Sequence, residues 1–371
     1  MTGQNKKAIV AAASLMLAPF GAFASGTALN TLTNEPVMSA PPAPPAAALA
    51  GLAAADPRFA ITPLPFKPQR DTDPHGKTAK EIGELNRLYV AASPAEKDLS
   101  AQLAVAAALA GRPISDLNAM YVDAAPNDKM LSVLLAAGAA LSNRGIAELN
   151  SLYVAATPKN REDSVVMALG AALSGLSAAE LNAMYTEATP RDSGISAALA
   201  AAAALSGKSM DELNALYQAA EPVDKLYSAQ LALGAALSGK PISEVNALYN
   251  AAAPTGKDLS ARLAVGAAIG DKTASEINEM YSAADPRERN FSAQLAAGAA
   301  LSGFGMDAVN AMYQDASPAD KDISAQLAVG NALADSKLSG ADKGRRWFVA
   351  ATVLFGLPAH PKPAAPPAAT R

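Results

Sequence analysis

A strict repeat of 32 residues constrains the fold of this chain more than any other feature. An asparagine opens the pattern, and Tyr, Ala, Pro and Ser follow it at fixed offsets in all eight units, without an insertion. The asparagines are Asn86, Asn118, Asn150, Asn182, Asn214, Asn246, Asn278 and Asn310, and the tyrosines are Tyr89, Tyr121, Tyr153, Tyr185, Tyr217, Tyr249, Tyr281 and Tyr313. A period of 20–50 residues indicates a stacked array of small structural units.

Each unit is predicted to hold two helices. The first is short, with Ser115, Asp211, Ser243, Ser275 and Asp307 expected as N-caps. The invariant proline should end it and occupy the first position of the second helix. That second helix is expected to cover about 17 residues, for example 222–238, and to stop at a glycine in the left-handed conformation. The glycines expected to do this are Gly111, Gly175, Gly207, Gly239 and Gly303.

One such hairpin cannot bury its own apolar faces, whereas a stack of hairpins can. The expected fold class is therefore all-α, a right-handed α-solenoid of about eight repeats over residues 78–334. At roughly 8–10 Å per unit the stack would extend some 70–80 Å. Residues 335–357 break the pattern and are expected to form a C-terminal capping helix. Its large residues would seal the last repeat, the alternative being a membrane or partner anchor; they are Trp347, Phe348, Val353, Leu354 and Phe355.

The flanks read as targeting and tethering segments. Residues 1–24 are predicted to be a signal peptide, with Lys6 and Lys7 before a short apolar stretch and an Ala-x-Ala site at 22–24. Residues 25–77 form a Pro/Ala-rich linker, and residues 358–371 a Pro/Ala-rich tail expected to be disordered. We therefore expect a periplasmic, secreted or cell-surface protein. The absence of Cys excludes a lipoprotein anchor as well as disulfides.

The repeat resembles the tetratricopeptide superfamily, and its Sel-like branch in particular. Residues 229–239 (AQLALGAALSG) are similar to the first helix of that branch, and residues 248–252 (LYNAA) to the second. The resemblance covers residues 85–334, although the period of 32 is shorter than usual. It implies an adaptor or scaffold that binds a protein or peptide partner on a concave surface, and it implies no shared catalytic residues.

The asparagine and tyrosine rows allow two interpretations. Residues at i and i+3 share a helix face, so the rows should form two ladders along the array. In the structural interpretation, which we favour, each Asn bonds the backbone of the adjacent unit and each Tyr packs with its hydroxyl paired. In the other interpretation the ladders bind a ligand. The invariant serine is expected to pack or to join this network.

A basic row is a second candidate site, because seven of the eight units carry Lys or Arg at one position, usually after an acid. We expect a solvated face, with a docking strip for an anionic polymer or partner as the alternative. The row is Lys97, Lys129, Arg161, Lys225, Lys257, Arg289 and Lys321.

Little in the sequence suggests catalysis or nucleic-acid binding. The only histidines, His75 and His360, lie outside the repeats, so we expect no catalytic site, metal or cofactor. The formal charge of −4, or −4 − 2 = −6 after loss of the signal peptide, disfavours nucleic acid. No stretch is long enough to predict a transmembrane span. The expected function is a non-enzymatic protein-interaction scaffold; the alternative is a structural spacer or self-assembling envelope protein.

Overall fold

The structure, a computed structural model, describes residues 79–354 except residue 319. The predicted signal peptide, linker and tail lie outside these residues. The described part is all-helical and contains no strand, so the prediction of an all-α array of two-helix repeats is confirmed. Eight short helices alternate along the chain with eight longer ones, and a further helix follows them.

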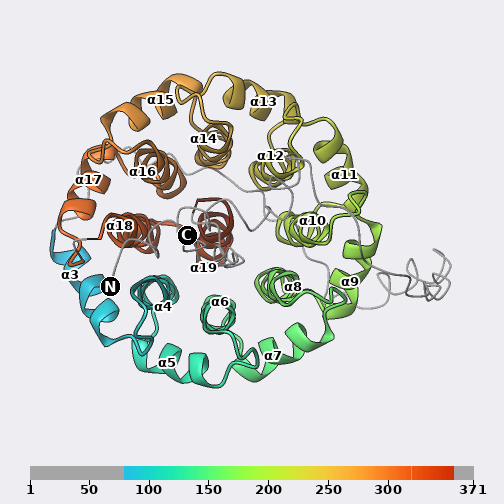
Figure 1. Ribbon diagram of the computed structural model, residues 1–371, viewed down its shortest axis with the longest axis horizontal. Helices are drawn as coiled ribbons and strands as arrows, with labels where there is room; N and C mark the ends of the chain where they lie inside the picture. Colours follow the sequence, from blue (N-terminus) through green and yellow to red (C-terminus); the bar gives the residue numbers. More distant parts are fainter. Residues whose placement is uncertain (1–78, 319, 355–371) are drawn as a thin grey trace, which may run out of the picture.

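The eight hairpins form a ring in which the short helices lie outside and the long helices inside (Figure 1). The outer helices are α3 (Ala79–Ala91), α5 (Ile114–Val122), α7 (Ile146–Ala155), α9 (Ala178–Glu187), α11 (Met210–Gln218), α13 (Ile242–Asn250), α15 (Ala274–Ala283) and α17 (Met306–Gln314). The inner helices are α4 (Lys97–Ala110), α6 (Lys129–Leu141), α8 (Arg161–Ser174), α10 (Ser193–Ser206), α12 (Lys225–Ser238), α14 (Lys257–Gly270), α16 (Arg289–Ser302) and α18 (Lys321–Asp335). The last segment is α19 (Gly340–Val349), which continues as the π-helix η2 (Ala350–Leu354).

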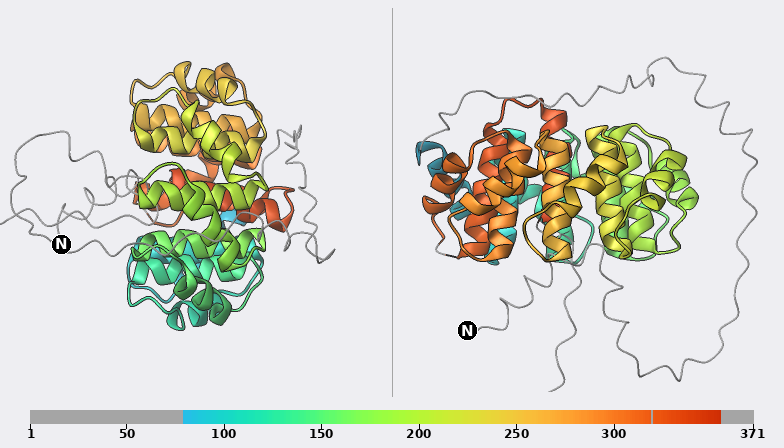
Figure 2. Two further views of the ribbon diagram at one scale, coloured as in Figure 1. Left: turned by 90° about the vertical axis from the view of Figure 1, so that its right-hand side faces the viewer. Right: turned by 90° about the horizontal axis from the view of Figure 1, so that it is seen from above.

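The array closes on itself, because α18 packs against α4 in the same way as other neighbouring inner helices pack together. The expected open stack of 70–80 Å is therefore wrong. The side-chain sizes explain the curvature. Inner helices, which run parallel to the ring axis (Figure 2), touch through Ala and Gly, whereas the outer helices lie along the circumference. An outer helix of nine or ten residues takes up about 14 Å of the circumference. The axes of neighbouring inner helices need to be only roughly 8–10 Å apart. This difference bends every unit in the same direction.

Glycine sets the close approach of the inner helices. A Cβ added at Gly266 would lie 2.7 Å from the Cβ of Ala297 in the next unit, and one at Gly170 would lie 2.8 Å from that of Ala201. The same contact joins the last unit to the first, since a Cβ at Gly330 would lie 2.3 Å from Val105 Cγ2. At these contacts even an Ala side chain would push the neighbouring inner helices apart, whereas two other units accommodate alanine at this position, as Ala106 and Ala202.

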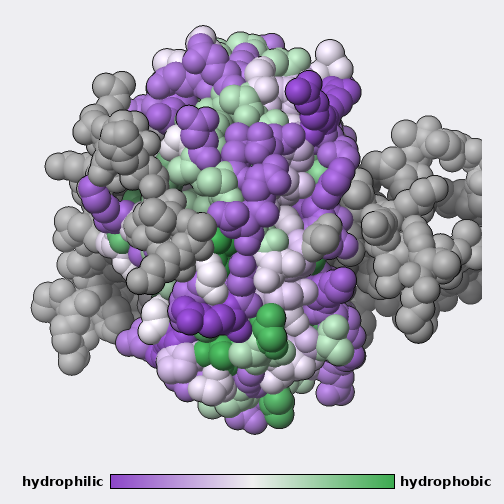
Figure 3. Space-filling model, turned by 90° about the vertical axis from the view of Figure 1, so that its left-hand side faces the viewer, coloured by the Kyte–Doolittle hydropathy of each residue, from purple (hydrophilic) through white to green (hydrophobic). Residues whose placement is uncertain are grey.

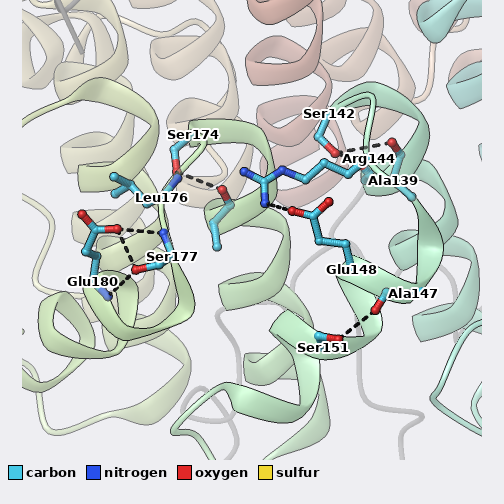
Figure 4. Close-up of polar contacts among 12 residues, drawn as sticks. Ala139, Ser142, Arg144, Ala147, Glu148, Ser151, Ser174, Leu176, Ser177 and Glu180 are labelled. Atoms are coloured by element: carbon cyan, nitrogen blue, oxygen red, sulfur yellow. Dashed lines mark hydrogen bonds and ion pairs between the residues drawn. The ribbon is translucent and has the colours of Figure 1, made fainter. Parts of the chain in front are cut away.

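Several helix ends differ from the prediction. The outer helices begin earlier than expected, so Ser115 and its equivalents lie inside them and do not cap them. The caps are two residues earlier, where Ser177, Ser209 and Thr273 each form a capping box with a glutamate. Figure 4 shows the box of Ser177 and Glu180, with Ser177 N to Glu180 Oε2 at 2.8 Å. An apolar residue such as Met210 is the first helical residue of its helix, not its predecessor.

The inner helices, in contrast, begin later than expected, three residues after the invariant proline. Asp128, Asp192, Asp224 and Asp320 cap them by accepting a backbone N–H, and the helices are mostly 14 residues long. Their predicted C-terminal glycines do have positive φ, as do Asn143 (φ 57°) and Asp271 (φ 52°) at the same position of two other units. Asn and Asp are the residues that tolerate this conformation best after glycine.

Candidate functional site

The invariant asparagines join each hairpin to the one before it. Asn118 donates from Nδ2 to the carbonyl of Ala91 at 3.0 Å and accepts from the backbone N–H of Ser93 at 2.8 Å. The equivalent pair of bonds occurs at all eight asparagines. Both polar atoms of each carboxamide therefore bond backbone groups, which is the arrangement expected for a structural ladder.

The invariant serines and prolines are partners of one another. Ser228 Oγ, for example, donates to the carbonyl of Pro222 at 2.6 Å inside the core, and the bond recurs in every unit. The serine lies in the first turn of the inner helix, and the proline lies in the turn before it. The bond thus fixes the chain where it passes from the outer to the inner layer.

The eight tyrosines of the ladder are half-buried and pack against the core. Among the described residues their hydroxyls have no hydrogen-bond partner, so the expected pairing of the hydroxyl is not observed. Burial, followed by nearby aspartates, raises the pKa of Tyr185 and Tyr217 above the ordinary value. The pKa of Tyr89, Tyr249 and Tyr313 is raised as well, again mainly by burial. These rings act as packing groups between neighbouring units.

The predicted basic row lies on one rim of the ring, where each member is the first residue of an inner helix. All seven are exposed. Lys129 Nζ lies 2.6 Å from Glu96 Oε1 and Lys321 pairs with Glu288, so these ion pairs join neighbouring hairpins and not adjacent residues. Each partner favours the charged form of the other: the pKa of Lys129 is raised and that of Glu96 is lowered. Because the pairs are solvated, they contribute little to stability. The docking strip stays a prediction.

The centre of the ring is occupied by the chain's own C-terminal segment, α19 and η2 (Figure 1). Trp347, Phe348, Val353 and Leu354 are 0–4% exposed there. The expected cap on an exposed last repeat is therefore wrong, since the closed ring has no such end; these residues fill the central channel instead. Phe355 lies outside the described residues.

The direction of this segment follows from two hydrogen bonds. The buried Arg346 donates to the carbonyl of Leu301, near the C-terminus of α16. Further along, the carbonyl of Leu354 accepts a bond of 3.2 Å from Gln294 Nε2, near the N-terminus of the same helix. The segment therefore runs antiparallel to the inner helices, and both bonds tie it to the channel wall.

Sequence reasoning missed the polar side chains of that wall. The position two residues after the invariant serine faces the channel, and in four units it holds glutamine. We call these the channel glutamines: Gln102, Gln230, Gln294 and Gln326, which are 4–8% exposed. Arg262 is the equivalent residue of α14; it donates to Asn290 Oδ1 at 2.6 Å, and burial lowers its pKa. The recurring Ala-Gln-Leu of these units was the available signal, but only the closed ring shows that it faces inward.

The outward position four residues after each invariant asparagine differs between units. We call it the outer row. On α3, α5 and α7 it holds Val90, Val122 and Val154, which are 76%, 73% and 75% exposed. The other five units carry polar residues: Thr186, Gln218, Asn250, Ser282 and Gln314. In Figure 3 the strongest green on the face shown lies in its lower half, over the part of the ring that contains α3 and α5. The valines therefore form an apolar row on one side of the ring.

Two other kinds of site were sought in the described part of the chain. Residues 79–354 without 319 contain no group of three or more His, Cys, Asp or Glu side chains that could hold a metal. In the same range, no single helix is long and apolar enough to cross a membrane; α6 and α7 meet the length and composition criteria only as a pair bent by 119°.

Comparison with known proteins adds no family to this description. No protein-family model matches the chain, and no curated protein is significantly similar to it. The geometry defines the class of protein: a closed helical-repeat ring with a filled channel.

Proposed function

We propose that this chain is an exported, non-enzymatic scaffold of tetratricopeptide-like, Sel-like type that binds a protein partner in the periplasm or at the cell surface. The observation that carries the proposal is the outer row. Its residues differ between units at an exposed position, and differences between units are what specific binding requires. Asn250 and Gln314 bond the preceding unit there, whereas the three valines are largely exposed. Signal-peptide features at residues 1–24 support export.

The three valines are the part of the outer row that a partner would use. Single exposed hydrophobic residues are ordinary on protein surfaces, but an aligned group is typical of interaction sites. Val223, in the loop before α12, is exposed too, at 96%, but it does not belong to this row. The partner should therefore present an apolar strip that spans neighbouring outer helices.

A triple variant tests this proposal. V90S/V122S/V154S should lower recovery of the partner from envelope extract at least tenfold, while the ring melts as before because the valines contact little. The matched control is T186S/Q218S/N250S, which changes the same position on other units and should leave recovery intact. Equal recovery with both variants would refute the outer row as the binding surface.

The alternative, self-assembly in the envelope, makes a different prediction for the same variants. The closed ring leaves no free end among the described repeats through which the array could extend. Assembly through the described residues would therefore join rings by their rims or their sides, and the valine row lies on one side. Sedimentation that shows a wild-type oligomer and a monomeric valine variant would favour self-assembly over a separate partner.

A further inference from the structure

Part of the channel wall is polar, whereas the C-terminal segment that fills the channel is mainly apolar. The wall is polar over five consecutive units, where Gln230, Arg262, Gln294, Gln326 and Gln102 face inward. In the remaining three units the same position is apolar: Leu134, Val166 and Ala198. Since neighbouring inner helices pack together in both parts, contact between them does not require glutamine here. The polar sector needs another explanation.

The occupant satisfies this polar sector poorly. Gln102, Gln326 and Gly330 line one hollow together with Trp347, Ala350 and Ala351 of the C-terminal segment. Gln230 lines a second hollow with Phe348, Thr352 and Val353. In these places the segment offers mainly apolar groups to the carboxamides, since the Thr352 hydroxyl donates to the Phe348 carbonyl of its own segment.

Hydrogen bonding shows the same mismatch. Neither polar atom of the Gln102 side chain, nor the Oε1 atom of Gln230 or Gln326, has a partner among the described residues, although all are buried. A buried polar group without a partner destabilises the folded state. The Oε1 atom of Gln294 has no partner there either, but its Nε2 donates to the Leu354 carbonyl.

The dimensions of the channel indicate what it can hold. Eight helix axes placed roughly 9 Å apart on a circle give a radius of about 12 Å. Subtracting about 5 Å for the half-width of each helix leaves a channel about 14 Å wide. One α-helix, roughly 10–12 Å in diameter, fills that space, as α19 does. A second helix cannot enter beside it, so any other helical ligand must take its place.

We propose that the channel is a binding site for an amphipathic helix of a partner protein, and that α19 and η2 are a resident occupant which this helix displaces. The ligand's apolar face packs against the wall formed by α6, α8 and α10. Its other face carries hydroxyl or amide groups that pair with the channel glutamines. This site is separate from the outer row, so the proposal does not depend on the proposed function.

The first experiment measures whether the channel glutamines stabilise the folded ring. Q102L/Q326L places at two units the leucine that α6 has naturally as Leu134, and it removes unpaired polar groups. Its Tm should be unchanged or raised. Gln294→Leu is the matched control, because it loses the bond to Leu354, and its Tm should fall. A fall of several degrees in the double variant would show that these glutamines are structural and would overturn the proposal.

The second test measures displacement. Trp347 is the only tryptophan of the chain and is 4% exposed, so its emission should shift to the red when α19 leaves the channel. The probe is a synthetic peptide with the sequence of residues 340–354 and the changes W347F, A350S and A351S, which put hydroxyl groups opposite Gln102 and Gln326. The control peptide carries W347F alone.

The serine peptide should displace α19 at a concentration at least tenfold lower than the control peptide does. In the Q102L/Q326L protein this difference should disappear, whereas V90S/V122S/V154S should retain it. Equal potency of the two peptides on the wild-type chain, or no red shift with either, would overturn the proposal and would leave the proposed outer surface unaffected.

Discussion

Asn86 accepts a hydrogen bond of 2.9 Å from the backbone N–H of Ser317, although 231 residues separate the two in the chain. Its Nδ2 also donates to the carbonyl of Asp315 at 3.0 Å. These are the same two bonds that every other invariant asparagine makes to the hairpin before it. The first hairpin is thus bonded to the last one as every other hairpin is bonded to the one before it. These bonds help to close the array into a ring.

Asn86→Ala should therefore destabilise the protein as much as Asn182→Ala does. Each change removes two bonds to the backbone and leaves polar groups of the preceding unit without a partner, a loss of roughly 1–3 kcal/mol. Urea unfolding measures both. Asn250→Ala is the control, because the Asn250 side chain lies on the surface and bonds only Glu221; its effect should stay within about 0.5 kcal/mol. An Asn86 variant as stable as the wild type would indicate an open array.

Gly330→Ala should destabilise the ring at its closing contact, because the new Cβ would meet Val105 at 2.3 Å. We expect a loss of roughly 1–3 kcal/mol, as for other overpacked sites. Adding Val105→Ala should recover part of this loss, since the smaller side chain makes room. Gly83→Ala is the control: it has nothing within 4 Å in α3 and should stabilise by up to about 1 kcal/mol. Additive effects of the two substitutions would argue against the contact.

Deletion of residues 181–212, one complete unit, should prevent the native fold. An open stack would tolerate the loss, but seven hairpins would have to bend more sharply to close. By the same geometry their channel would shrink to about 11 Å, too narrow for α19 with its tryptophan and phenylalanine. Near-ultraviolet circular dichroism and Trp347 emission would report the loss. A cooperative, native-like melt of the shortened chain would contradict a closed ring.

The protein should lose stability between about pH 10 and pH 12 partly through Tyr227. Burial, then the charges of Asp258 and Asp224, raises the pKa of Tyr227 to about 12 from an ordinary 10.0. The folded state therefore holds this proton more tightly than the unfolded state, so the contribution is complete below pH 10 and is lost as the pH rises to 12. Tyr227→Phe should flatten the dependence of urea stability on pH in that window. An unchanged slope would show that the phenol ionises normally.

The hairpin and its joints could be predicted from the sequence, because each depends on residues a few positions apart. The 32-residue period required two helices per unit, and the left-handed glycines marked the helix ends. A repeated asparagine was expected to bond the neighbouring backbone. The position of the N-caps was missed by two residues, because Ser209 caps the helix that begins at Met210, whereas Asp211 was the expected cap.

Closure and the filled channel could not be predicted in this way. A sequence period specifies that every unit packs against its neighbour in the same way. It does not specify the angle between neighbouring units, because that angle depends on contacts such as the one between Gly266 and Ala297. Without that angle, Trp347 and Phe348 could only be placed at an end of the stack. The channel glutamines were overlooked for the same reason, because without that angle the sequence does not show which face of the inner helices lines a closed channel.

The eight inner helices run in one direction, and this gives the ring two electrically different rims. Each helix carries about half a positive charge at its N-terminus and half a negative charge at its C-terminus, so the eight contributions add along the axis. The C-terminal segment enters against this direction, with its own dipole opposed to all eight. A helix inserted the other way round would bring like poles together, and the ring therefore selects the polarity of whatever helix it admits.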